Sequence, residues 1–308
     1  MSDKQALLPG LTDPGRPVVD REFTIAERRQ WQIVLRRFLR HRLATISLLV
    51  LAALALVAFV GPHFWIHDFT TPDSPGSSPP TLNNPFGTDD IGRDQFARVM
   101  RGTQQSLKVA LLAAFLSTVI GAPWGAISGL FGGRVDTIMM RICDLLLVLP
   151  GLVVAGALAG GSNGTWFIVA LVLGLLGWVV NARVVRGVVL SLREQEFIEA
   201  ARAVGAGPTR IVLRHLLPNA AGVIIVQATL DIAAAILGEA GLSFLGLGVQ
   251  APDTSLGLLV NQAIIAVETR PWLFYLPGVV IILIALGVNF VGDGLRDALD
   301  PRQTRQRR

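Results

Sequence analysis

Long uninterrupted runs of apolar side chains constrain this chain more than any other feature. A helix needs about 20 mostly apolar residues to cross a bilayer, where lipid offers the backbone no hydrogen-bond partners. Of the 308 residues, 52% are hydrophobic and only 16% are charged, which is too few to cover the surface of a soluble fold. The sequence therefore predicts an all-α integral membrane protein with six transmembrane helices, at residues 43–62, 107–130, 142–160, 165–182, 220–239 and 272–292.

The distribution of lysine and arginine indicates how these helices are oriented. If both termini are cytoplasmic, nine, two, six and five basic residues fall in the cytoplasmic segments 1–42, 131–141, 183–218 and 294–308. Only four, none and one fall in the external segments 63–108, 161–164 and 240–271. Because cytoplasmic loops are enriched in Lys and Arg, we expect a multi-pass bacterial inner-membrane protein with both termini in the cytoplasm. The basic residues lie in separate loops and tails, so they do not indicate a nucleic-acid partner.

The segment before the first apolar run has the pattern of an amphipathic helix. Thr24 and Glu27 form a candidate capping box. Apolar residues then recur at helical spacing with arginines between them (Trp31, Leu35, Phe38, Leu39; Arg28, Arg29, Arg36, Arg37, Arg40). This pattern predicts a helix along the cytoplasmic face, held by anionic lipid. The alternative is that the arginines only set the orientation of the first span. After that span, the proline-rich residues 63–86 predict an irregular external loop.

Residues 191–218 form an unusually long polar stretch between two predicted spans. Ser191 and Glu194 are positioned to cap a helix. On that helix, one face carries apolar and small side chains at helical spacing, namely Phe197, Ala200, Ala201 and Val204. Gly205 and Gly207 would end it.

Pro208 can open a second short helix, over 209–217, with Pro218 setting the turn into the fifth span. The pattern predicts two short helices that project from the membrane. Their side chains are small enough for a groove on a partner protein to close around the helices. The alternative is a loop folded back on the chain's own helices.

Four motifs in this order resemble those of a known family. Glu199-Ala200-Ala201, then Gly205, then Leu217-Pro218 resembles the EAA motif of permease subunits from bacterial ABC importers. NPFGTDDIGRD at 84–94, GLSFLGLG at 241–248 and GDGLRDALDP at 292–301 resemble segments of the dipeptide and oligopeptide branch, the DppC/OppC-type permeases. The resemblance covers roughly 84–302. His215, Gln104 and Asp231 depart from the common pattern of the family.

The resemblance implies an ABC importer permease fold whose loop 191–218 docks on a separate ATPase. The implied coupling residues are Glu199, Ala200, Ala201, Gly205, Leu217 and Pro218. The implied partners are a homologous DppB/OppB-type permease, two ATP-binding domains or subunits and an extracytoplasmic peptide-binding protein. The expected divisions are a cytoplasmic tail (1–42), a first transmembrane helix (43–62), an external loop (63–104), a permease domain with five transmembrane helices (105–293) and a second cytoplasmic tail (294–308).

The residues themselves indicate no catalysis on this chain. A phosphate-binding loop needs a lysine in G-x-x-x-x-G-K-[ST], and neither Lys4 nor Lys108 lies in that pattern. His63 and His67 have the spacing of metal ligands, but no third ligand accompanies them. Ser243 has no base nearby in the sequence. We therefore expect no catalytic residue, metal or cofactor here, with ATP and Mg²⁺ bound by partner subunits.

Three polar residues within the predicted spans are candidates for the substrate pathway. They are Asp231 in the middle of the fifth span, Glu239 near its external end, and Asn289 late in the sixth. An acid facing the pathway could satisfy the cationic amine of a peptide. The alternatives are a structural hydrogen bond for Asp231 and a solvated interfacial position for Glu239. The motifs also leave open nickel or glutathione as substrate. An ATP-independent carrier is the alternative from another class.

Overall fold

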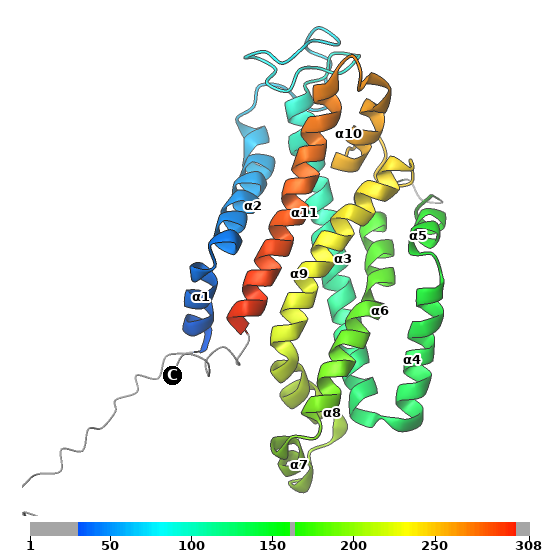
Figure 1. Cartoon of the computed structure of the whole chain (residues 1–308). Coiled ribbons are helices and arrows are strands. Elements are labelled where there is room, and N and C mark those ends of the chain that lie inside the picture. The colour runs from blue at the N-terminus through cyan, green and yellow to red at the C-terminus, as the bar shows by residue number, and fades with distance from the viewer. Residues whose placement is uncertain (1–29, 161–163, 300–308) are drawn as a thin grey trace, which may run out of the picture.

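The computed structural model describes residues 30–160 and 164–299, and within them the chain is built from helices and connecting loops. Figure 1 shows the long helices running side by side, with α7 and α8 at one end of the bundle and α10 at the other. Extended pairing in the described part is confined to two isolated bridges, Pro72 with Arg93 and Thr88 with Asp94. The predicted all-α class is confirmed, and residues 63–86 are irregular as expected.

Five helices of the described chain are long and apolar enough to cross a membrane. α2 is Arg42–Val60, continued by the turn η1 (Gly61–His63); α3 is Gln95–Phe131, α6 is Trp166–Leu192, and α11 is Pro271–Leu299. α9 (Leu217–Phe244) continues from α8 (Pro208–Ile211) through the turn η2 (Val212–Leu216). Each of the five covers one predicted apolar run. The short helix α10 (Leu256–Ala263) and the turn η3 (Ile264–Ala266) lie between α9 and α11.

The third predicted span, 142–160, is not a single straight helix. It is divided between α4 (Gly133–Val148) and α5 (Gly151–Gly160), which are bent by 78° relative to each other. Pro150 explains the break, because the residue before a proline is disfavoured in the helical conformation. Leu149 accordingly has extended dihedral angles, with φ of −72° and ψ of 131°. The predicted third span is therefore a broken pair of helices, and the described chain has six candidate spans when this pair is counted as one.

α3 begins well before the apolar run that predicted it. The Asp94 side chain accepts a hydrogen bond of 2.8 Å from the backbone N–H of Ala97, which caps the first turn. Arg98, on the next turn, donates to Asp89 at 2.9 Å, and both side chains are buried. This outer extension of α3 therefore fastens the loop that contains the 84–94 motif to the end of the bundle.

α3 and α6 approach each other at three glycines of α3, spaced one turn apart. A Cβ on Gly121 would lie 2.5 Å from the carbonyl oxygen of Trp178, and one on Gly125 would collide with the carbonyl oxygen of Ala182. At Gly129 the added Cβ would lie 2.8 Å from Val189. Small residues allow this approach of two backbones, which is the usual basis of tight packing between membrane helices.

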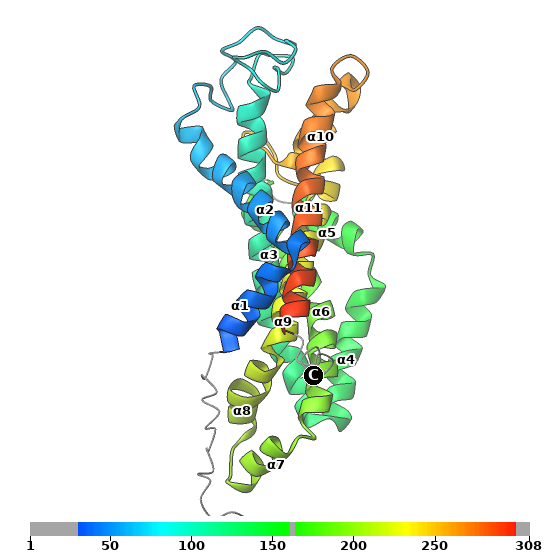
Figure 2. The same ribbon diagram turned by 60° about the vertical axis from the view of Figure 1, so that its left-hand side comes forward.

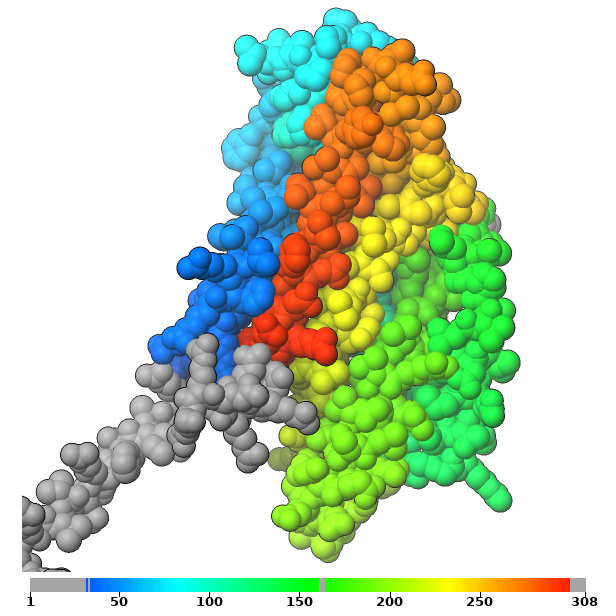
Figure 3. Space-filling model, in the orientation of Figure 1, coloured from blue at the N-terminus to red at the C-terminus, as the bar shows by residue number. Residues whose placement is uncertain are grey.

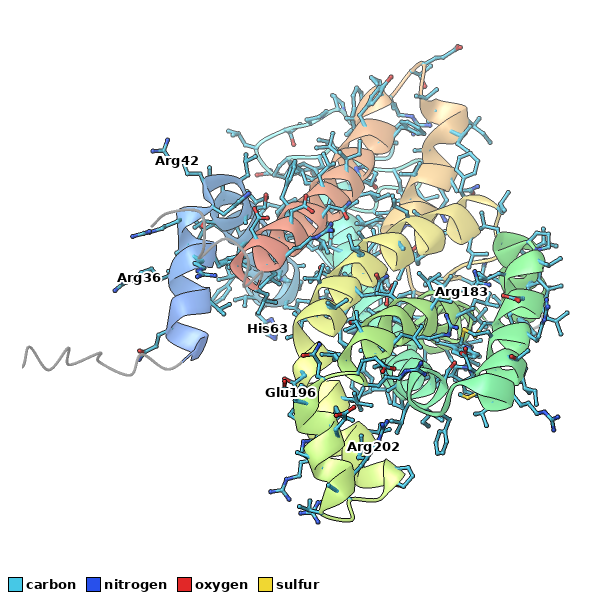
Figure 4. The ribbon with its side chains drawn as sticks, turned by 60° about the horizontal axis from the view of Figure 1, so that its bottom comes forward. Arg36, Arg42, His63, Arg183, Glu196 and Arg202 are labelled. Carbon is cyan, nitrogen blue, oxygen red and sulfur yellow. The ribbon has the colours of Figure 1, made fainter. Side chains whose placement is uncertain are left out.

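A helix precedes the first span, as predicted. α1 (Gln30–Arg40) packs Phe38 against Ala298 of α11, and Phe38 is buried. Figure 4 shows the side chain of Arg36 pointing away from the bundle. The predicted capping box at residues 24–27 lies outside the described residues. Contact of α1 with lipid stays a prediction.

The glycine contact leads to a test of stability. Gly125→Ala should destabilise the folded protein by about 1–3 kcal/mol, the usual cost of overpacking. The measurement is the thermal unfolding of the purified protein in detergent. Gly187→Ala on α6 is the matched control, because a Cβ there meets nothing within 4 Å; it should leave the unfolding temperature unchanged or raise it. Equal unfolding temperatures for Gly125→Ala and the wild type would contradict the assigned contact.

Candidate functional site

The helix α7 (Glu196–Ala203) forms the tip of the loop 191–218. Two glutamates in its first turn interact favourably with the positive end of the helix dipole. It ends at Gly205, whose φ of +84° is readily adopted only by glycine. The N–H of Ala206 then bonds to the carbonyl oxygen of Ala201 at 3.0 Å, which completes a Schellman-type end. Figure 3 shows the loop protruding at one end of the molecule.

The start of α7 differs from the prediction. Ser191 belongs to the last turn of α6, and its hydroxyl donates to the carbonyl oxygen of Val188 at 2.7 Å. A serine that bonds back within a helix is not free to cap the next one. The capping box predicted at Ser191 and Glu194 is therefore wrong. A three-residue turn instead separates α6 from α7.

The predicted face of α7 is divided between two surroundings. Ala201 is buried, but Ala200 is exposed, and the side chains of Phe197 and Val204 are 40% and 85% exposed. The residue that anchors the helix is Ile198, which is 0% exposed. α7 therefore packs through one apolar face and presents a second one outward.

The inward face of α7 joins the loop to the long helices. Ile198 belongs to an apolar cluster drawn from α3, α6 and the second arm of the loop, whose other buried members are Ala122, Ala126, Val185, Val189, Ile211, Val212 and Leu216. In addition, the guanidinium of Arg193 donates to the carbonyl oxygen of Gly129 at 3.0 Å. The loop is thus packed on the ends of α3 and α6. It does not hang free.

The second arm of the loop continues directly into the fifth span. A helix was expected over 209–217, followed by a turn at Pro218, and that turn is absent. The backbone passes instead through the π-helical turn η2, where the N–H of Leu217 bonds to the carbonyl oxygen of Val212. A proline ring crowds the carbonyl one turn before it, and a widened turn relieves this clash. Leu217 packs beside the apolar cluster, and Pro218 is exposed.

Asp231 lies at the centre of a polar cluster between α3, α6 and α9. One carboxylate oxygen accepts from the Asn181 amide at 2.5 Å and from the Ser117 hydroxyl at 3.2 Å. The other accepts from the Gln227 amide at 3.2 Å. Within the described residues, Asp231 has no cationic partner among the salt bridges. The expected structural hydrogen bond between spans is therefore present.

Asp231 also lines a cavity of about 240 Å³. Its remaining walls are mostly apolar and come from α3, α5, α6 and α9, namely Ala113, Ala114, Ser117, Gly151, Leu152, Ala155, Leu173, Leu176, Gly177, Ala234, Ala235 and Gly238. A carboxyl group bonded only to neutral donors at the edge of an apolar cavity has no ion pair to break when it binds a cation. The arrangement suits a ligand that carries one positive group.

The partners of Asp231 were missed in the sequence. Gln227 could have been found, because it stands one helical turn before Asp231 on the same helix. Ser117 and Asn181 lie on other helices, and their meeting depends on the glycine contact between α3 and α6. No spacing along one helix reveals such a meeting.

Glu239 occupies neither of its expected positions. It is 0% exposed, so it is neither at a solvated interface nor on the wall of the cavity. Its carboxylate accepts from the hydroxyl of Ser106 at 2.8 Å and from that of Ser243 at 2.6 Å. Ser243 in turn lies 3.1 Å from Ser255, the N-cap of α10. Glu239 thus joins α3, α9 and α10 in the interior, and the hydroxyl of Ser243 is one of its two hydrogen-bond donors.

The remaining candidates lie elsewhere. Asn289 is half-buried on α11 and is not among the residues that line the cavity at Asp231. Gln104 donates to the carbonyl oxygen of Ala58 on α2, at 2.6 Å. In the loop before α3, a hydrogen bond of 2.8 Å to the Asp73 carboxylate raises the pKa of His67.

Comparison with known proteins places this architecture. Residues 121–305 match the family described as "Binding-protein-dependent transport system inner membrane component". Residues 29–85 match the "N-terminal TM domain of oligopeptide transport permease C". Together the two matches span most of the chain.

Curated relatives are similar over nearly their whole length. The oligopeptide transport system permease protein OppC of Mycobacterium tuberculosis (strain ATCC 25618 / H37Rv) is 42% identical over 279 residues, which cover 90% of this chain and 96% of that protein. OppC of Bacillus subtilis (strain 168) is 40% identical, with coverage of 88% and 90%. OppC of Haemophilus influenzae (strain ATCC 51907 / DSM 11121 / KW20 / Rd) is 39% identical, with coverage of 92% and 93%.

A solved structure shares the fold at lower identity. An inward-facing form of the MetNI methionine ABC transporter superposes with a TM-score of 0.55 and 22% identity, over 66% of this chain and 97% of that chain. The matched family model covers more than half of the sequence, and the three curated relatives match at least 88% of this chain and 90% of their own length. This chain therefore belongs to the family of binding-protein-dependent transport system inner membrane components.

Proposed function

We propose that this chain is the permease subunit of an ATP-driven importer of dipeptides or oligopeptides. The names of the three relatives, all oligopeptide transport permeases, support the substrate class. The chain forms half of the translocation pathway, and a homologous DppB/OppB-type permease forms the other half. An extracytoplasmic peptide-binding protein delivers the substrate. The charge distribution supports cytoplasmic termini, which places the loop 191–218 in the cytoplasm.

The outward face of α7 is the observation that carries this proposal. Phe197 and Val204 are exposed at the tip of a polar loop, although α7 is already anchored through Ile198. Such a second apolar face at a protruding point is characteristic of a surface that a partner covers. The occupant that fits is a cleft of an ATPase subunit, closed around a helix whose small residues, Ala200 among them, allow close approach.

The packing of the loop supports a transmission of force from that contact. When two ATPase domains close on ATP, the cleft displaces α7. Because Ile198 is buried among side chains of α3 and α6, and Arg193 is bonded to Gly129, the displacement reaches these spans as a rigid-body movement. Glu199, Ala200, Ala201 and Gly205 set the fit of the helix, and Leu217 and Pro218 support its second arm.

The energy source lies on other chains in this proposal. The sequence holds only Lys4 and Lys108, and neither belongs to a phosphate-binding pattern. Lys108 lies on α3, with its ammonium 5.6 Å from the ring centroid of Trp166. ATP and Mg²⁺ therefore bind to the partner ATPase subunits, and this chain is a non-catalytic subunit.

The cavity at Asp231 is the part of the pathway that this chain supplies. A peptide in passage carries a cationic amine, which an apolar cavity cannot solvate. The carboxyl group of Asp231 is bonded only to neutral donors, so a substrate amine can replace one of them and form an ion pair without breaking another.

If α7 docks on the ATPase, a single charge introduced on its outward face should prevent that association. Val204→Asp should leave insertion and folding intact, because this side chain is 85% exposed, but it should abolish co-purification of the ATPase subunits and ATP-dependent uptake. The measurement is pull-down of the assembled complex, followed by peptide uptake in proteoliposomes.

Ile265→Asp is the matched control for that variant. It makes the same change at an exposed residue at the opposite end of the bundle, and the ATPase should still co-purify. Normal ATPase association and uptake with Val204→Asp would rule out α7 as the docking helix.

The pathway role of Asp231 predicts a charge-dependent loss. Asp231→Asn keeps the shape of the side chain but removes its charge, so uptake of peptides with a free N-terminal amine should fall about tenfold, a loss of roughly one charge-assisted interaction. Uptake is measured in the reconstituted complex, with an N-acetylated peptide as control, whose transport should not change. Undiminished uptake of the free-amine peptide would remove Asp231 from the pathway.

A further inference from the structure

α4 lies at the edge of the bundle. Figures 1 and 2 show it beside α6 and apart from α9 and α11, and Figure 3 shows α4 and α5 along one side of the molecule. Much of its apolar surface is exposed, including Ile138, Leu145 and Val148. What holds α4 to the rest of the chain is therefore a small set of contacts with α6 and with the end of α3.

The strongest of these contacts is an ion pair between Asp136 of α4 and Arg186 of α6. The guanidinium donates twice, from Nε to Oδ1 at 2.5 Å and from Nη2 to Oδ2 at 2.6 Å. The hydroxyl of Ser128, on α3, also donates to Oδ1 at 2.5 Å. The Asp136 side chain is only 15% exposed. A two-point pair with a third donor fixes both distance and orientation, unlike a single surface ion pair.

A second pair and an apolar patch extend the same seam. Asp144 of α4 bonds to Arg183 of α6, and Figure 4 shows Arg183 between these helices. Beside the second pair, Cys143 of α4 is 0% exposed and packs against Trp178 and Val179 of α6. Two ion pairs and one buried apolar patch thus join α4 to α6, and Cys143, in that patch, is the only cysteine in the chain.

Both ends of the seam lead to parts of the proposed function. Beyond Arg186, α6 continues through a short turn into α7, the proposed ATPase contact. Beyond Asp144, only Leu149 and Pro150 separate α4 from α5. Gly151, Leu152 and Ala155 of α5 form one wall of the cavity at Asp231. A displacement of α6 that α4 follows therefore moves a wall of that cavity.

We infer that Asp136 and Arg186 are positioning residues for transport, which hold α4 to α6 throughout the cycle and so carry movement of the loop 191–218 to the α5 wall of the cavity. This inference rests on the proposed ATP-driven function. The pair acts through α4 and α5, and neither side chain lines the cavity. The ion pair makes the broken third span move together with α6. The few apolar contacts of α4 alone would not keep it on α6 when α6 moves.

The experiment uses Cys143 as a native reporter in the complete membrane complex. A membrane-permeant maleimide is applied to the wild type without nucleotide and in an ATP-trapped state, and the 33.0 kDa chain is separated to read its labelling. Cys143 should be protected in both states, because α4 stays on α6. Rapid labelling in either state would show that the helices separate during the cycle and would overturn the inference.

Variants then test the pair itself. Asp136→Asn and Arg186→Gln should each increase the labelling rate of Cys143 and lower the peptide transported per ATP hydrolysed about tenfold, a usual size of coupling between linked sites. The double exchange Asp136→Arg with Arg186→Asp should restore protection and coupling. Arg134→Gln is the control, since Arg134 is an exposed residue of α4 that takes part in none of the salt bridges of the described residues. Full coupling in both single variants, or no recovery in the exchange, would refute the role.

The two proposals fail in different ways. If wild-type complex shows no ATP-dependent uptake, the proposed function is wrong, whatever the labelling of Cys143. If the wild type transports peptide normally and Asp136→Asn does so with unchanged coupling, the function stands and the positioning role falls.

Discussion

The backbone contact between α3 and α6 is the interaction on which the rest of the structure depends. Lipid tails are as apolar as the side chains of the helices, so the hydrophobic effect does not favour contact between helices over contact with lipid. Close packing must therefore supply the stability. Gly121, Gly125 and Gly129 supply it by removing the side chains that would keep the helices apart. α3 also packs on α2, α9 and α10, so the pair is the core around which the other spans are placed. The Asn181 side chain meets Ser117 and Asp231 only because Gly121 leaves room for it.

Apolar runs predicted the spans well where the helix and the run coincide. They did not predict where a helix begins or bends, because hydropathy does not report these features. α3 extends outward through polar residues such as Arg98, because its stability there comes from a cap and a buried ion pair, which an apolar run does not detect. Pro150 breaks the third span within a stretch, 145–160, that carries no charged residue on either side of the break. The length criterion identifies residues that lipid accepts, but not where the helix axis turns.

The candidate site shows the same division. Helical periodicity identified α7, but both of its faces carry apolar residues, and spacing alone does not tell which face is buried. Ile198 turned inward, whereas Phe197 and Val204 remained outside. Asp231 and Glu239 look alike in the sequence, yet eight residues at about 100° each turn them roughly 80° apart on the helix. That rotation separates a carboxylate at a cavity from one enclosed by serines.

The π-helical turn η2 sets the rotation of the fifth span about its axis relative to the loop 191–218. A π turn holds one residue more than an α turn, and one residue corresponds to a rotation of about 100° around the helix axis. Without it, everything after Leu217 would be rotated against α8, so that Asp231 would face another direction while α7 kept its place. The extra residue at Val212–Leu216 thus acts as an angular offset. It lets the docking surface and the cavity be oriented independently, although the second arm of the loop and the cavity wall belong to one continuous helix, from Pro208 to Phe244.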